Sequence, residues 1–123
     1  MIDNRFLLAD LLGVGGSSKV YSANTATGQE VAVKIIRKDK GYSDKLSQRL
    51  IQVESYIMKV LGHHPNLVNC LYSNAEGNVI LADGEHSIRY LVMEKCKNGS
   101  LANLIKQTGS LEEEQARVLF IQL

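Results

Sequence analysis

A glycine cluster at residues 13–16 most constrains the fold, because it lies between two runs that favour β-strands, Arg5–Leu12 and Lys19–Ala23. Glycine lets a backbone approach phosphate oxygens closely and present N–H donors without an intervening side chain. The spacing fits G-x-G-x-x-G, except that Ser18 stands at the third glycine position. Taken alone, the cluster is typical both of a phosphate-binding loop and of a flexible hairpin turn.

The segment after the glycines separates the nucleotide-binding folds. A dinucleotide-binding fingerprint needs a helix that begins directly at the glycines, but residues 19–23 show no helical period before the turn at Thr27–Gln29. A P-loop needs G-x-x-x-x-G-K-[ST], which this chain lacks. The pattern therefore indicates a glycine loop that joins two antiparallel strands, and it disfavours a dinucleotide-binding domain.

Lys34 lies inside an otherwise apolar strand, Glu30–Ile36, and a carboxylate that could meet it lies in the next helix. Apolar residues recur every three or four positions over residues 44–61, which predicts one long helix with an apolar stripe. On a helical wheel of about 100° per residue, Glu54 falls inside that stripe. The stripe consists of Leu46, Leu50, Val53, Ile57 and Leu61.

An ionised carboxylate among leucines is costly unless a cation pairs with it. We therefore expect an ion pair between Lys34 and Glu54. The alternatives are a lysine whose stem lies along the protein surface and a glutamate at the edge of the stripe that reaches water.

Two further strands are predicted, at Leu67–Tyr72 and Ile88–Met93. The segment between them, Ser73–Ser87, contains two turn-like strings, Glu76-Gly77-Asn78 and Asp83-Gly84-Glu85. We therefore expect Ser73–Ser87 to be a long hairpin connection, and a solvated loop rather than an insertion that binds a partner.

Residues that suit helix ends mark the helices. Ser43 or Asp44 can cap the long helix, and Gly62 stands where a left-handed residue would end it. After the second predicted strand, Ser100 can cap a short helix. Residues 110–113 read as a capping box that opens a last helix.

The composition excludes several classes of protein. The 123 residues leave room for one domain. Fourteen Lys and Arg against thirteen Asp and Glu give a formal net charge of +1, which argues against a nucleic-acid partner. No apolar run approaches the roughly 20 residues of a membrane span, and the first residues lack the order of a secretory signal. We therefore expect a cytoplasmic protein with no membrane partner.

Cys70 and Cys96 fit neither a disulfide framework nor the spacing of zinc ligands, so no metal site is predicted. Cys96 is expected to be an ordinary small buried residue, because its neighbours give no charge that would activate a thiol.

Five motifs occur in a fixed order along the chain: Leu12–Val20, Val31–Lys34, Glu54 within a helix, His64–Val68 and Tyr90–Glu94. This series resembles a eukaryotic protein kinase, from the first strand of the small lobe to the first long helix of the large lobe. The resemblance implies an α+β fold, in which a small lobe with a five-stranded antiparallel sheet and the αC helix precedes a hinge and two helices of an incomplete large lobe. The implied boundaries are 1–93 for the small lobe, 94–99 for the hinge and 100–123 for the start of the large lobe.

The resemblance also implies an ATP site, with Mg²⁺ accompanying the nucleotide, and a protein substrate for a complete kinase. Lys34 would hold the phosphates and pair with Glu54, and these two are the implied catalytic residues. The other implied ATP-binding residues are Gly13, Gly15 and Ser18 in the glycine loop, Leu12, Val20, Ala32 and Val68 as apolar walls, Met93 as the gatekeeper, Glu94 and Cys96 through their backbone groups in the hinge, and Ser100 near the ribose.

Some positions match the family in detail and others depart from it. Met58 and Cys70 match two of the stacked hydrophobic positions that register the αC helix. Ser17 and Ser18 replace the usual aromatic residue and glycine at the tip of the loop. We therefore expect the loop to cover the phosphates less tightly, with nucleotide binding weakened rather than lost.

The catalytic loop H-R-D-x-x-x-x-N and the metal-binding D-F-G of this family do not occur in the 123 residues. We therefore expect the ATP-binding part of a Ser/Thr-type protein kinase, as a truncated chain that is not catalytic by itself. The alternative is a non-catalytic kinase-like module that binds a nucleotide or a partner. The last helix would expose Val118–Ile121 and Leu123, so association through that apolar helix is a further expectation.

Overall fold

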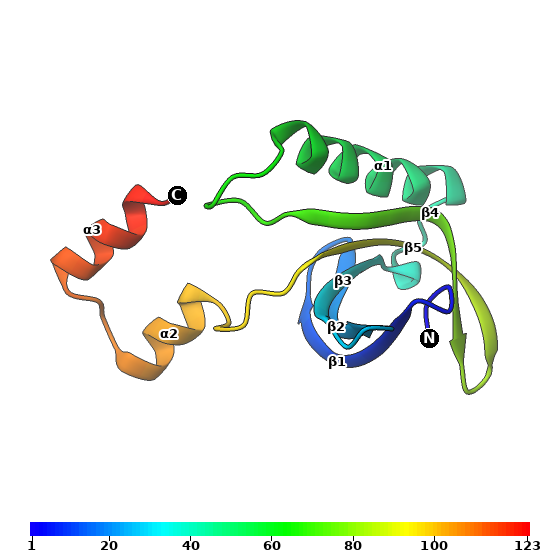
Figure 1. Cartoon of the computed structure of the whole chain (residues 1–123), viewed down its shortest axis with the longest axis horizontal. Helices are drawn as coiled ribbons and strands as arrows, with labels where there is room; N and C mark the ends of the chain where they lie inside the picture. The colour runs from blue at the N-terminus through cyan, green and yellow to red at the C-terminus, as the bar shows by residue number, and fades with distance from the viewer.

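The computed structural model describes residues 1–123 as an α+β structure, so the fold class expected from the sequence is confirmed (Figure 1). A five-stranded antiparallel sheet curls on itself, a long helix lies along one side of it, and two short helices extend away. The division of the chain at residues 93 and 99 stays a prediction. The elements are β1 (Phe6–Val14), β2 (Ser18–Thr25), β3 (Glu30–Ile36), the 3₁₀ helix η1 (Lys38–Lys40), α1 (Asp44–Leu61), β4 (Cys70–Leu81), β5 (Gly84–Glu94), α2 (Leu101–Thr108) and α3 (Glu113–Ile121).

The strand order is β1-β2-β3-β5-β4, and every neighbouring pair is antiparallel. Because successive side chains of a strand point to opposite faces of the sheet, β3 presents Val31 and Val33 to one side and Ala32 and Lys34 to the other. The first side is the inside of the curl and carries the main core. That core consists of Ile2, Phe6, Ala23, Val31, Val33, Val79, Ile88, Tyr90 and Val92.

The first residues of the chain close the curled sheet. The strands β1 and β4 form its two edges. Ile2 bridges both of them, through Phe6 in β1 and Val79 in β4, and its side chain is fully buried. The backbone at the N-terminus therefore seals a gap between two edges that do not pair with each other.

Asp3 holds this closure in place through three hydrogen bonds, which we call the N-terminal latch. Its carboxylate accepts from the Asn78 N–H at 2.8 Å, from Asn74 Nδ2 at 2.9 Å and from the Tyr90 hydroxyl at 2.6 Å. Burial opposes the charge on Asp3, but the hydrogen bonds from Tyr90, Asn78 and Asn74 outweigh it and hold the pKa of Asp3 below its ordinary value of 3.8. Burial, together with the bond to Asp3, raises the pKa of Tyr90.

The segment Ser73–Ser87 is a strand hairpin, so the expected solvated loop was wrong. β4 continues to Leu81 and β5 begins at Gly84. Only Ala82 and Asp83 form the turn between them. The connection is therefore shorter than the sequence suggested, and both strands are longer.

Gly77 explains why a turn-like string can lie within β4. A Cβ atom at this position would overlap the ring of Tyr90, lying 2.9 Å from its Cδ1 atom and closer still to Cε1. Gly77 is buried, and the pairing of β4 with β5 is irregular between Asn74 and Gly77. A glycine inside a strand commonly marks such a close approach. Here it leaves room for the aromatic ring that bonds to Asp3.

Helix α1 packs on the sheet through a different face from the one predicted. Its buried residues are Ile51 and Ser55, which are four positions apart and so lie on one side of the helix. Leu46, Val53 and Ile57 of the predicted stripe are 43%, 46% and 51% exposed. The apolar period correctly located the helix, but most of its stripe faces solvent.

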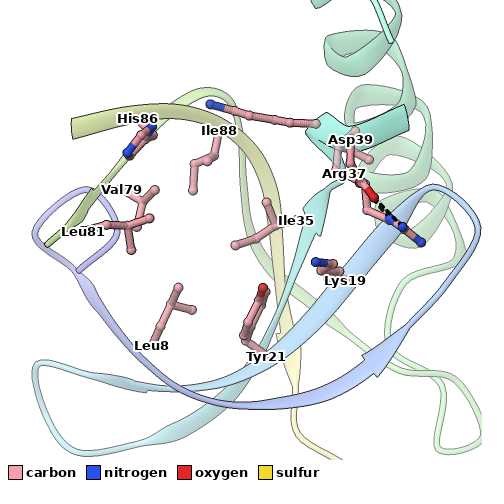
Figure 2. A pocket seen from close by; sticks show the side chains of 12 residues that line it. Leu8, Lys19, Tyr21, Ile35, Arg37, Asp39, Val79, Leu81, His86 and Ile88 are labelled. Carbon is pink, nitrogen blue, oxygen red and sulfur yellow. Dashed lines mark hydrogen bonds and ion pairs between the residues drawn. The ribbon is translucent and has the colours of Figure 1, made fainter. Parts of the chain in front are cut away.

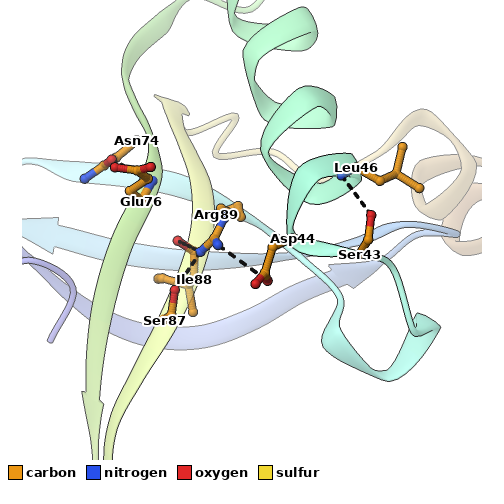
Figure 3. Close-up of polar contacts among 8 residues, drawn as sticks. All are labelled: Ser43, Asp44, Leu46, Asn74, Glu76, Ser87, Ile88 and Arg89. Atoms are coloured by element: carbon orange, nitrogen blue, oxygen red, sulfur yellow. Dashed lines mark hydrogen bonds and ion pairs between the residues drawn. The ribbon is translucent and has the colours of Figure 1, made fainter.

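One ion pair links the start of α1 to β5, and polar contacts within each element lie beside it (Figure 3). The Ser43 hydroxyl caps the helix by accepting from the Leu46 N–H at 3.2 Å, which confirms one of the two predicted caps. Arg89 lies 3.6 Å from the Asp44 carboxylate and donates to the Ser87 hydroxyl at 2.6 Å. The helix therefore begins beside a strand that also carries nucleotide-site candidates.

Helices α2 and α3 contact no other helix or strand (Figure 1). Ser100 caps α2 as predicted, by accepting from the Asn103 N–H at 3.2 Å. The predicted capping box at residues 110–113 is shifted by two positions, because α3 begins after Glu112, whose N–H donates to the Gln115 side chain at 3.4 Å. None of the helices combines the length and apolar character that crossing a bilayer requires.

Candidate functional site

One face of the sheet gathers the candidate residues of β2, β3 and β5. In the strand register Val20 lies opposite Lys34, Lys34 opposite Leu91, and Ala32 opposite Met93. Residues directly opposite each other share a face, so all five side chains belong to the side away from the main core. This side also carries α1.

Lys34 and Glu54 form the ion pair expected from the sequence. The Lys34 Nζ atom lies 2.6 Å from Glu54 Oε1, and the two side chains are 26% and 37% exposed. Glu54 thus lies at the edge of the packed face of α1, where it pairs with the lysine and still touches water. An exposed pair of this kind contributes less than about 1 kcal/mol to stability. The roles of both residues toward a nucleotide stay predictions.

Two groups of contacts between α1 and the sheet set the position of the helix, and hence of Glu54. The hydroxyl groups of Ser55 and Ser73 lie 2.8 Å apart. Two small side chains let the helix approach β4 closely. Met58, Cys70 and Met93 pack against a buried cluster of Ile36, Ile51 and Leu91.

The glycine loop between β1 and β2 presents unused backbone donors. Gly13 lies opposite Val20 in the register, and the Gly15 N–H donates to the Ser18 carbonyl at 2.8 Å, which closes the turn. The N–H groups of Gly16 and Ser17 at its tip donate to no backbone or side-chain acceptor. Free N–H groups in a glycine turn are the kind of donors that hold phosphate oxygens.

Arg37 anchors this loop, and sequence reasoning missed it. Its backbone N–H donates to the Ser17 carbonyl at 2.9 Å, and its Nη1 atom donates to the Gly15 carbonyl at 2.9 Å. The guanidinium also binds Asp39 at 2.6 Å, and this hydrogen bond lowers the pKa of Asp39 to about 2. The only signal in the sequence is a basic residue directly after β3, which is too common to be informative.

Three of the predicted ATP-binding residues are less clearly placed at the site: Leu12, Val68 and Ser18. Leu12 lies at an irregularity in the pairing of β1 with β2. Val68 precedes β4 outside any helix or strand and is 40% exposed. Ser18 is buried at the start of β2. The structure therefore brings Val20, Ala32, Lys34, Glu54 and Met93 together more clearly than these three.

The segment after β5 holds the remaining candidates. The Glu94 carboxylate accepts from the Asn69 N–H at 3.0 Å, and the Ser100 hydroxyl is engaged as the cap of α2. Cys96 is exposed, so the expectation of a small buried residue was wrong. It follows the end of β5, where no layer of the fold covers it. Its N–H donates to no acceptor in the chain and stays free for a ligand.

The residues present suit a nucleotide better than a metal alone. A lysine held by a glutamate, free loop N–H groups and an apolar sheet face match a phosphate group and a planar base. No group of three or more His, Cys, Asp and Glu side chains is arranged to hold a metal ion. The residues of this chain therefore fit the nucleotide but supply no set of Mg²⁺ ligands.

The fold defines a class: a curled five-stranded sheet crossed by one helix, followed by a connecting segment and two helices, is the small lobe of a protein kinase with the start of the large lobe. The family model described as the protein kinase domain matches residues 6–123. The chain belongs to the protein kinase family.

Several curated proteins are similar over nearly the whole chain. CBL-interacting protein kinase 11 of Oryza sativa subsp. japonica is 38% identical over 120 residues, which are 97% of this chain and 22% of that protein. CBL-interacting serine/threonine-protein kinase 9 of Arabidopsis thaliana is 35% identical over 113 residues, 91% of this chain and 23% of that protein. Sperm motility kinase 2B of Mus musculus is 33% identical over 120 residues, 97% of this chain and 22% of that protein. The chain thus spans less than a quarter of the length of these relatives.

Proposed function

We propose that this chain is the ATP-binding part of a Ser/Thr-type protein kinase, an enzyme that transfers a phosphoryl group from ATP to protein Ser or Thr. The observation that carries the proposal is the Lys34–Glu54 ion pair of 2.6 Å on the sheet face that continues from the glycine loop. The relative described as a serine/threonine-protein kinase supports the Ser/Thr type.

The phosphates would meet the loop and the lysine. Free N–H groups of Gly16 and Ser17 donate to phosphate oxygens, and the Lys34 ammonium neutralises their charge. Glu54 acts as a positioning residue, because it fixes the ammonium rather than touching the nucleotide. Mg²⁺ bound to ATP would supply further charge neutralisation.

The adenine would lie against the apolar face beyond the lysine. Val20 and Ala32 form its walls, and Met93 lies at the back of the slot, opposite Ala32 in the register. The free N–H of Cys96 is available to the adenine edge. Backbone donors of this kind recognise the shape of a base with little dependence on the side chain.

Phosphoryl transfer needs groups outside these 123 residues. The H-R-D and D-F-G strings, which supply the substrate-orienting and metal-binding aspartates in this family, do not occur in the sequence. We propose that the chain binds ATP but does not transfer its phosphoryl group by itself. Transfer by the 123-residue chain that disappears in a Lys34→Met variant would contradict this.

Nucleotide binding is tested by thermal unfolding and calorimetry with ATP and Mg²⁺. ATP at ten times its dissociation constant is expected to stabilise the chain by about 1.4 kcal/mol. Lys34→Met is expected to weaken binding about tenfold or more, because a charge-assisted contact to phosphate is lost. Lys45→Met, which removes an exposed lysine of α1, is the matched control and should bind as the unsubstituted chain does.

A partner-binding module is the second candidate, favoured by the exposed apolar stripe of α1. Leu46, Val53 and Ile57 leave an open surface that nothing in the chain covers. If this is the sole function, millimolar ATP and Mg²⁺ would give no stabilisation. Titration with ATP therefore distinguishes the two candidates directly.

A further inference from the structure

A cavity of about 440 Å³ opens at the end of the curled sheet (Figure 2). Every strand contributes to its apolar wall, through residues such as Leu8, Tyr21, Ile35, Val79 and Ile88. Cavities of about 300–1,000 Å³ with mostly apolar walls and a few polar groups are typical of small-molecule sites. The sheet itself separates this cavity from the proposed nucleotide site, since Ile35 and Lys34 are consecutive and point to opposite faces.

The rim of the cavity is cationic. It carries Lys19, Arg37 and Lys38 against a single carboxylate, Asp39. Arg37 already binds that carboxylate at 2.6 Å. Lys19 lies close enough to help lower the pKa of Asp39, yet neither Lys19 nor Lys38 forms an ion pair within the chain.

Figure 2 shows Lys19 among the lining side chains, next to Tyr21 and Ile35. His86 lines the other side, where it binds Asp83 at 2.8 Å and so is already engaged. An unpaired ammonium group therefore stands directly beside apolar walls. This combination suits a ligand that is apolar at one end and negative at the other.

We propose that this cavity binds a small amphipathic anion, an organic molecule with an apolar body and one acidic group. The body packs against Leu8, Ile35 and Val79. The acidic group lies at Lys19, whose ammonium holds it by a charge-assisted hydrogen bond, and Lys38 adds positive charge at the rim.

The charges of the rim decide the class of ligand. A cation would be repelled by Lys19 and Lys38. A neutral apolar molecule would gain the wall contacts but leave both ammonium groups unpartnered, so it binds more weakly. The proposal does not depend on nucleotide binding, because no residue named for the anion is needed for ATP.

The test titrates octanoate and 1-octanol into the ¹³C-methyl-labelled 123-residue chain and follows the methyl resonances by NMR. Octanoate is expected to shift the methyls of Leu8, Ile35, Val79 and Ile88 in a saturable way. The neutral alcohol, with the same chain length, is expected to bind about tenfold more weakly. Equal affinity for both probes, or shifts confined to Leu46, Val53 and Ile57 of α1, would overturn the proposal.

Two kinds of variant keep the result interpretable. Lys19→Gln is expected to weaken the binding of octanoate about tenfold. Lys38→Gln, at an exposed position, is expected to weaken it measurably. The affinity for 1-octanol should stay unchanged in both variants. Leu81→Trp, at a half-exposed lining position, is expected to fill the mouth and abolish binding of both probes. Lys45→Gln on α1 is the matched control and retains full affinity. Octanoate binding that is unaffected by Lys38→Gln and by Leu81→Trp contradicts the proposal even if Lys19→Gln does not fold.

Discussion

Lys34 and Glu54 form an ion pair that matters for position more than for stability. Both side chains are partly exposed, so water screens their attraction and the net contribution to folding is small. The pair nevertheless holds the ammonium on the sheet face that carries Val20 and Met93. At the scale of single residues, we therefore propose that Glu54 serves to orient the Lys34 ammonium.

Replacement of Glu54 by glutamine separates these two roles. The free energy of unfolding is expected to fall by less than about 1 kcal/mol. The affinity for ATP is expected to fall about fivefold, the equivalent of about 1 kcal/mol, because the lysine is no longer held toward the phosphates. Calorimetric titration and urea unfolding measure the two effects. Glu76→Gln, at an exposed position of β4, is the control; ATP affinity equal to that of the control would contradict the positioning role.

Individual residues differed in how far the sequence could place them. The pairing of Lys34 with Glu54 was predictable, because a charge in an apolar pattern needs a partner. The bond from Arg37 to the Gly15 carbonyl was not, since it depends on the backbone path of a loop that no side-chain pattern describes. The exposure of Cys96 was missed for a similar reason: it depends on which layers cover the segment after β5.

At the scale of elements, the β4–β5 hairpin shows how a turn-like string can lie inside a strand. The string Glu76-Gly77-Asn78 favours a turn, so local sequence preference alone would end the strand there. Instead the aromatic ring of Tyr90 occupies the space where a side chain at position 77 would lie. A contact between neighbouring strands therefore overrides the local preference, and single-sequence reasoning has no access to it.

The hairpin gives a direct prediction. Gly77→Ala is expected to lower the free energy of unfolding by about 1–3 kcal/mol, because the added methyl group must displace the Tyr90 ring. Gly16→Ala, whose Cβ would meet no atom within 4 Å, is the control for the general effect of the substitution. Chemical denaturation of both variants provides the comparison. Equal stability of the two would show that the ring is free to move.

Helix α1 shows a different outcome. The apolar period over residues 44–61 predicted the position of the helix correctly, but it predicted the wrong face to pack on the sheet. A stripe of leucines and related residues is normally the face that packs. In this chain the face of α1 that contacts the sheet contains Ser55. Its hydroxyl oxygen lies 2.8 Å from that of Ser73 in β4. Small polar residues allow a close approach that hydropathy does not score, so the helix turns its stripe outward.

At the scale of the whole molecule, the fold class and the order of the elements were predictable, because each strand and helix has its own pattern and the motifs follow one order. The curl of the sheet was not predictable. Its closure depends on Ile2, which bridges β1 and β4, and on Asp3, which bonds to β4 and β5. Two residues near a chain end carry no periodic signal.

The N-terminal latch makes stability depend on pH. The folded-state pKa of Asp3 is held below its ordinary value of 3.8, so its contribution is complete above that value and is lost as the pH falls through the folded-state pKa. Asp3→Asn is expected to cost about 2 kcal/mol at neutral pH, with the difference shrinking in acid. Asparagine suits the left-handed backbone at this position, where φ is 46°, so the loss reports on the carboxylate, both its charge and its second acceptor oxygen, rather than on backbone strain.

Urea unfolding at several pH values between neutral and strongly acidic checks this expectation. Asp10→Asn, at an exposed position of β1 whose carboxylate forms no hydrogen bond, is the control and should change neutral stability little. A difference between Asp3→Asn and the unsubstituted chain that stays constant on acidification would contradict the role of the carboxylate.

The same latch also bears on the order in which the chain folds. Its partners are separated from Asp3 by 71, 75 and 87 positions in the sequence, so closing the latch requires a long loop. We therefore expect the latch to close after the β4–β5 hairpin has formed. Contacts made after the rate-limiting step slow unfolding rather than speed folding. In stopped-flow experiments Asp3→Asn is therefore expected to unfold faster and refold at nearly the unsubstituted rate. The first three residues would then act mainly as a kinetic barrier against the sheet opening.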